Sequence, residues 1–196
     1  MNILKHIHID SLMTKMRNRL AILMVLLAGM VSVSCVKEKL ELTYNNQEAS
    51  ISKYIESALG KDEKCTVVNN GGSNRLTLVQ GEGEELKADG SLTFYYAGYT
   101  FSGSVSPANM FTTNREASAN DAGWNLTDGE YDALTLNLKD DRLIPGLKKG
   151  LEGVKAGEEC EIIFTGKYGF GNKTFGMIPA NSALLYKIWV VSISNE

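Results

Sequence analysis

LIPGLKKGLEGVKAGEE, at Leu143–Glu159, is the stretch of this chain that decides its fold. The pair Pro145–Gly146 marks the start of a helix, because Pro fixes the φ angle and Gly tolerates unusual backbone angles. Leu147, Leu151 and Val154 then recur four and three residues apart, which places them on one apolar helical face. A helix this short is not stable by itself in water. We therefore expect it to pack on the strand-like segments that precede and follow it.

Segments of alternating side chains around this helix predict the strands of an antiparallel sheet. In residues 92–97, Leu, Phe and Tyr at every second position alternate with Thr and Tyr, which is the period of a half-buried strand. The pair Asp89–Gly90 is a turn signal that precedes this segment. Short turns indicate antiparallel connections, so we predict an α+β fold with an antiparallel sheet packed on a helix. The predicted strands are residues 65–68, 75–80, 92–97, 134–138, 160–164 and 184–193.

Residues 1–34 have the features of an export signal. A basic region precedes a mostly apolar run of 14 residues, 20–33, which is too short for a membrane span. Small residues and a cysteine close the run at Ser32–Cys35. This arrangement resembles a bacterial lipoprotein signal, in which Cys35 becomes the lipidated first residue, although Ser32 stands where Leu is usual. An ordinary signal peptide cleaved nearby is the alternative.

Removal of this leader changes the chemistry that the chain can carry out. The 20 basic residues fall to 16 and the 23 acidic residues to 22, which gives a net charge of about −6. This charge disfavours nucleic acids and anionic lipid surfaces as partners. Both histidines, His6 and His8, are lost with the leader. We therefore exclude Ser-His-Asp and Cys-His catalysis and His-ligated metal sites, and we expect no metal and no cofactor.

Two further segments follow the leader. Residues 35–74 are expected to form a lipidated tether and a short helical extension. Within them, residues 36–47 are charged and polar, which is typical of a tether, and residues 48–59 have apolar side chains at helical spacing before Gly60. Residues 75–196 then form the main domain.

The two cysteines that follow Cys35 leave two possibilities open. An exported protein can oxidise Cys65 and Cys160 to a disulfide. Cys160 also shares strand parity with Ile162 and Phe164, which favours a buried free thiol equally well.

Five short motifs, in a fixed order, resemble those of the FKBP-type peptidyl-prolyl cis-trans isomerases. Each motif is weak by itself, but the ordered set extends from about Arg75 to Ser194. The resemblance implies an antiparallel sheet of about five strands wrapped around the short helix, with an apolar pocket between them. The motifs are FYYAG at Phe94–Gly98, LIPGLKKG at Leu143–Gly150, VKAGE at Val154–Glu158, YGFG at Tyr168–Gly171 and MIPANSAL at Met177–Leu184.

The resemblance implies a role for each pocket position. The backbone N–H of Ile144 would bond a substrate carbonyl, and the Tyr168 hydroxyl would help to hold the ligand, with Phe170 serving instead if the loop is shifted. Leu147 stands where the family usually has Trp, and Thr112 where it usually has Asp, so we expect weak to moderate activity. The catalytic residues implied are Tyr96, Phe111, Ile144, Leu147, Tyr168, Ile178 and Tyr186, and the substrate-binding residues are Leu134, Leu143, Phe170, Met177 and Thr112.

The activity that the resemblance implies is isomerisation of X-Pro bonds in proline-containing polypeptides. Rotation about this amide faces a barrier of roughly 18–20 kcal/mol and breaks no bond, so it requires no histidine. A dry pocket favours the twisted amide, because this is less dipolar than the planar one. We expect a monomer that assists folding in the bacterial cell envelope, as an outer-membrane lipoprotein that faces the periplasm or the cell surface. The alternatives are a non-catalytic FKBP-like binding or chaperone module and a structural lipoprotein.

Overall fold

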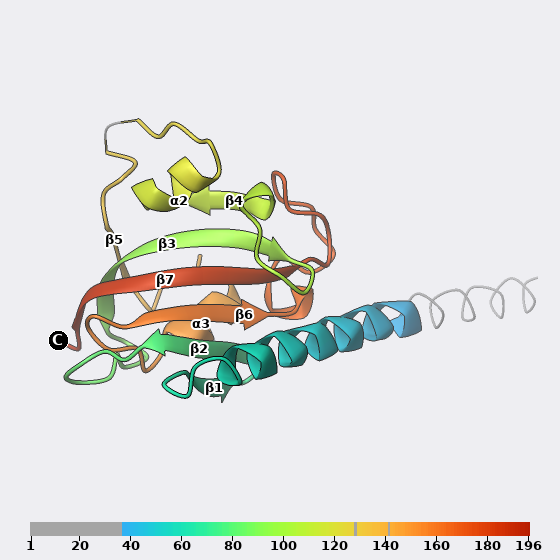
Figure 1. Ribbon diagram of the computed structural model, residues 1–196, viewed down its shortest axis with the longest axis horizontal. Helices are drawn as coiled ribbons and strands as arrows, with labels where there is room; N and C mark the ends of the chain where they lie inside the picture. Colours follow the sequence, from blue (N-terminus) through green and yellow to red (C-terminus); the bar gives the residue numbers. More distant parts are fainter. Residues whose placement is uncertain (1–36, 128, 141) are drawn as a thin grey trace, which may run out of the picture. The chain divides into compact units, whose positions relative to one another are not determined.

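One antiparallel sheet runs through the computed structural model, which describes residues 37–127, 129–140 and 142–196 (Figure 1). The chain divides into two units, Met1–Thr43 and Tyr44–Glu196, and the sheet lies in the second. Its strand order is β1-β2-β6-β7-β3-β4, and β5 also pairs with β3. The strands are β1 (Thr66–Asn70), β2 (Ser73–Val79), β3 (Ser91–Phe101), β4 (Met110–Thr113), β5 (Leu134–Asn137), β6 (Glu159–Phe164) and β7 (Ala183–Ser194).

The sheet is larger than the resemblance implied. In the described part of the chain it has seven strands, against about five expected, and β4 is a strand that the side-chain pattern did not predict. Apart from the N-terminal helix, the helical elements are short: α2 (Glu116–Asp121), α3 (Pro145–Leu151) and the 3₁₀ turns η1 (Pro107–Asn109) and η2 (Gly166–Tyr168).

The pairing of β3 with β7 forms the middle of the sheet. The two strands pair from Ser91 opposite Ser194 to Phe101 opposite Ala183. The outer edge of β3 is shared, because β5 pairs with its beginning, residues 91–94, and β4 pairs with residues 97–99. The side chains of β4 therefore lie beside the second half of β3, away from β5.

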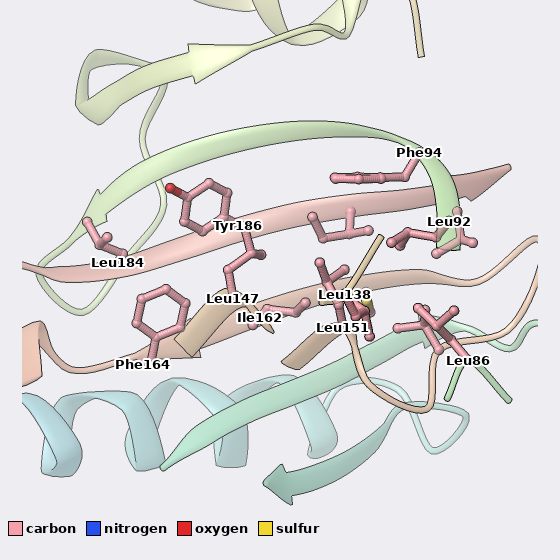
Figure 2. Close-up of a cluster of buried hydrophobic side chains, with 14 of the residues drawn as sticks. Leu86, Leu92, Phe94, Leu138, Leu147, Leu151, Ile162, Phe164, Leu184 and Tyr186 are labelled. Atoms are coloured by element: carbon pink, nitrogen blue, oxygen red, sulfur yellow. The ribbon is translucent and has the colours of Figure 1, made fainter. Parts of the chain in front are cut away.

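Helix α3 packs on β6 through its glycines. A Cβ atom at Gly146 would overlap the Phe164 ring, and one at Gly150 would overlap Ile162. The bare backbone therefore lets the helix approach the strand closely. Figure 2 shows the buried cluster that results, which contains the predicted apolar helix face, Leu147, Leu151 and Val154, together with Leu86, Leu92, Phe94, Leu138, Ile162, Phe164, Leu184 and Tyr186.

A buried ion pair closes the end of α3. The Arg75 guanidinium donates hydrogen bonds to the carbonyl oxygens of Gly150 at 3.3 Å and Glu152 at 2.7 Å. These are carbonyls that a helix end leaves without internal partners. Arg75 Nε lies 3.3 Å from Glu158 Oε1, which also accepts a hydrogen bond from Thr77 Oγ1 at 2.9 Å. The pair thus links β2, the helix end and the start of β6.

The N-terminal helix is longer than predicted. It covers residues 37–59 of the described chain, so the helix predicted over residues 48–59 also includes residues 37–47, which were expected to form part of a tether. This stretch is rich in Lys, Glu and Leu, which are strong helix formers, but it has no apolar period to indicate a packed face.

Within Tyr44–Glu196, this helix covers the face of the sheet opposite α3. Ile51 and Ile55 are buried in a second apolar cluster with residues of β3 and β7. Tyr54 packs edge-on against Phe101, and its hydroxyl donates a hydrogen bond to the buried Glu161 carboxylate at 2.8 Å. The part of the helix that belongs to this unit is therefore packed firmly on the sheet.

Both remaining cysteines are free thiols. Cys160 is buried in the cluster beneath α3, as its strand parity predicted. Burial, chiefly, raises the pKa of its thiol well above the usual value. The predicted leader and the lipidation residue Cys35 lie outside the described residues. In the part of the chain that is described, no helix has the length and apolar character needed to cross a membrane.

Candidate functional site

An apolar groove of about 410 Å³ opens between β4, β7 and the loop that joins β6 to β7. None of its lining side chains carries a charge, so it suits an uncharged ligand. A carboxylate or an ammonium group buried there would lose its hydration without gaining a counter-charge. The lining residues are Phe111, Thr112, Phe170, Phe175, Gly176, Met177, Ile178 and Tyr186.

Gly98 makes room for the aromatic wall of the groove. It lies opposite Tyr186 on β7 and opposite Thr112 on β4. A Cβ atom at this position would be 2.8 Å from Cζ of Phe111, which is closer than real contacts allow. Phe111 and Tyr186 meet edge-on over this glycine, with ring centroids 5.7 Å apart.

The β6–β7 loop supplies the opposite wall. Phe170 and Phe175 stack in parallel with ring centroids 4.7 Å apart. Phe175 and Ile178 exchange two backbone hydrogen bonds of 3.0 and 2.9 Å, which form a tight turn at the tip. Phe175 is 62% exposed and Met177 68% exposed, whereas Ile178 is buried. The loop therefore presents a large apolar surface at the rim and a buried aliphatic side chain beneath it.

Leu147 and Phe164 lie beneath the groove in the same buried cluster as Tyr186. The Phe164 and Tyr186 rings are nearly parallel, with centroids 6.2 Å apart. Burial, and to a smaller extent Tyr96, raises the pKa of the Tyr186 hydroxyl, so it stays protonated at neutral pH. In the view of Figure 2, Leu147 of α3 lies below Tyr186.

Several residues implied by the resemblance do not line the groove. Tyr96, Leu143 and Ile144 are partly buried against the same cluster. Ile144 is the N-cap of α3, and its carbonyl accepts a hydrogen bond from Lys148 N–H at 3.1 Å. Among the described residues, none accepts a backbone hydrogen bond from the Ile144 N–H.

Two implied residues lie away from the groove. The Tyr168 ring contacts the turn at Gly72, and the ammonium group of Lys149 lies 5.0 Å from the ring centroid. Phe170, which the resemblance offered as the alternative to Tyr168, lines the groove. Leu134 is 42% exposed on β5, where it pairs with Phe94. It lies apart because β5 and the groove are at different ends of β3.

Phe175 and Gly176 line the groove, but the sequence reasoning did not select them. The signal was present, because Phe175 lies in the glycine-rich loop just before Met177 and Ile178.

Within the described residues, no group of three or more His, Cys, Asp or Glu side chains is placed to hold a metal ion.

The fold and the groove together define a domain with an uncharged, apolar groove beside a short buried helix. The chain belongs to the FKBP-type peptidyl-prolyl cis-trans isomerase family, whose model matches residues 83–191. This membership, with the likeness to solved structures of this fold, confirms the predicted α+β architecture.

Similar proteins carry the same family description. Two FKBP-type peptidyl-prolyl cis-trans isomerases named FkpA, from two strains of Buchnera aphidicola, are 28% and 30% identical over 159 and 177 residues. These matches cover 80% and 83% of this chain, and 57% and 61% of the relatives. The chain therefore spans less than two thirds of their length. The crystal structure of FkpA from Escherichia coli superposes with a TM-score of 0.52 at 21% identity, over 82% of this chain and 65% of that one.

Proposed function

We propose that this protein catalyses the cis-trans isomerisation of X-Pro peptide bonds in polypeptides. The single observation that carries this proposal is the uncharged groove, walled by Phe111, Phe170, Phe175 and Tyr186, in a domain of the isomerase family. A proline ring and its apolar neighbour match the chemistry of such a groove, because neither carries a charge.

The groove needs only to bind the twisted amide better than the planar one. The planar amide is more dipolar and loses more hydration on entering an apolar site, so the groove favours the transition state. The Ile144 N–H holds a substrate carbonyl, and the rings of Phe111 and Tyr186 hold the proline. No proton is transferred and no bond is broken.

Two substitutions relative to the family pattern support weak to moderate activity. Leu147 is smaller than the Trp that the family usually has at this position. Thr112 lines the groove where the family usually has a carboxylate that orients the ligand. Both changes reduce how firmly a substrate is positioned, and positioning supplies much of the rate in reactions without covalent chemistry.

A non-catalytic holding function is the second candidate. The exposed Phe175 and Met177 favour it, because they extend the apolar surface beyond what one proline residue covers. Such a surface suits an unfolded segment several residues long.

We further propose that the protein works in the bacterial cell envelope on proline-containing chains. The support is the lipoprotein-like leader that ends at Cys35 and the acidic mature chain. Metabolic labelling with a palmitate analogue tests it, and we expect Cys35→Ser to abolish labelling. Labelling that persists in Cys35→Ser, or no labelling of the parent, contradicts lipidation at this residue.

A protease-coupled assay with X-Pro peptides tests the activity. We expect Phe111→Ala and Ile178→Ala to lower kcat/KM about tenfold, because about 1.4 kcal/mol of lost transition-state contact has this effect. Val68→Ala, which truncates an exposed side chain on β1, is the control and keeps the parental rate. Parent protein that is folded by circular dichroism but has no rate above background overturns the enzymatic proposal. Protection of unfolded clients without turnover then supports the holding function.

A further inference from the structure

The β6–β7 loop, residues 165–182, closes on itself at a backbone junction below the groove. Gly171 N–H donates a hydrogen bond to the Gly166 carbonyl at 2.9 Å, and Asn181 N–H donates to the Gly171 carbonyl. A Cβ atom at Gly166 would overlap the Asn181 carbonyl, so the two ends of the loop are in backbone contact. Phe170 is adjacent to this junction, and its position depends on it.

One side chain from the N-terminal helix bridges both ends of the loop. The Gln47 amide oxygen accepts a hydrogen bond from Gly166 N–H at 2.9 Å, and its nitrogen donates to the Asn181 carbonyl at 2.6 Å. Tyr44, one turn earlier, donates from its hydroxyl to Oδ1 of Asn181 at 2.9 Å. Asn181 has a φ of +60°, which is rare for a residue other than glycine and is maintained by its surroundings.

The helix that carries these residues is a firm support. Two turns further along, Ile51 and Ile55 are buried against the sheet. Tyr44 and Gln47 lie outside residues 83–191, which the family model matches, so the bridge comes from the segment that precedes the matched domain.

We propose that Gln47 and Tyr44 are positioning residues that hold the β6–β7 loop in the conformation that forms the groove. A groove wall that shifts by as little as about 1 Å no longer fits its ligand, so a loop without this support binds less well. The activity readout of this inference rests on the proposed isomerase function, but the loop readout does not.

The test compares Gln47→Met and Tyr44→Phe with the parent. Methionine keeps the length and helix propensity of glutamine but makes neither hydrogen bond. Because Gln47→Met removes two hydrogen bonds and Tyr44→Phe removes one, we expect amide hydrogen exchange of residues 166–181 to be about tenfold faster in Gln47→Met and about threefold faster in Tyr44→Phe. KM for an X-Pro peptide should rise several-fold with a smaller change in kcat. The matched control is Gln80→Met, since the Gln80 side chain bonds Thr66 on β1 at 3.0 Å, remote in sequence from the loop.

Loop exchange at the parental rate in Gln47→Met overturns the inference. Faster exchange spread equally over the loop and the β3–β7 pair also overturns it, because the bridge would then stabilise the whole domain and not the loop. Faster exchange confined to the loop supports the inference, even if the parent has no isomerase activity. In that case only the proposed function fails.

Discussion

Replacing Glu158 by glutamine tests whether a buried charge pair holds α3 against the sheet. Glu158 and Arg75 are 4% and 9% exposed, and Glu158 Oε1 lies 3.3 Å from Arg75 Nε. Glutamine keeps the shape of the side chain and its bond to Thr77, but it leaves the guanidinium without a counter-charge. Removing one partner of a buried pair costs about 3–5 kcal/mol.

The expected loss is measurable by thermal unfolding. For a domain of about 150 residues, each kcal/mol lowers Tm by roughly 2–4 °C, so Glu158→Gln should lower it by about 6–20 °C. Glu152→Gln is the control, because the Glu152 carboxylate makes only an exposed 3.4 Å contact with Asn70. We expect it to change Tm by about 1 °C or less.

The outcome separates two roles of Arg75. A fall of less than about 2 °C in Glu158→Gln would refute the reasoning, because Arg75 would then be satisfied by the helix carbonyls alone. The double variant Arg75→Met with Glu158→Met removes both charges but also the donors to Gly150 and Glu152. We therefore expect it to remain less stable than the parent.

Three further predictions concern the groove and pH. Gly98→Ala places a methyl group 2.8 Å from Cζ of Phe111, so it should cost about 1–3 kcal/mol and raise KM; an unchanged KM and Tm contradicts the packing described. Phe170→Ala should lower kcat/KM about tenfold, whereas Tyr168→Phe should leave it within about twofold; the reverse order would mean that Tyr168 holds the ligand. Burial, followed by Glu161, raises the pKa of Tyr54 above its ordinary 10.0, so the folded protein holds this proton more tightly than the unfolded chain does. This contribution to stability is fully present below about pH 10 and is lost as the pH rises above it. Denaturant unfolding at about pH 8 and about pH 10.5 should therefore show a smaller fall in the free energy of unfolding for Tyr54→Phe than for the parent. An equal fall in the two proteins contradicts this prediction.

Much of the fold could be predicted from residue periodicity. The apolar face of Leu147, Leu151 and Val154 and the alternation in β3 each reflect local geometry, so they were readable without tertiary contacts. The length of the N-terminal helix could not be predicted in this way, because the sequence of its first turns shows no apolar period. The contact between this helix and the loop depends on Gln47. In the sequence this residue has no distinguishing feature, because only the folded structure brings it to Gly166 and Asn181.

The sequence indicated several residues that line the groove, but it did not indicate where each side chain points. The loop residues Phe170, Met177 and Ile178 line the groove, but the tilt of the Tyr168 ring toward Gly72 depends on how η2 meets the β1–β2 turn. Leu134 illustrates the same limit for register. Its alternation predicts a strand, but only the pairing of β5 with residues 91–94 places it away from the groove.

The position of β7 in the middle of the sheet also bears on when the chain folds. β7 is the last strand in the sequence, and it lies between β6 and β3 in the sheet. Until residues 183–194 have been synthesised, the half-sheets on either side have no common partner, and the closure of such distant contacts is slow. A precursor that cannot complete its sheet early stays unfolded for longer. This is the state that a translocation channel accepts, and it would favour export of the proposed lipoprotein before folding.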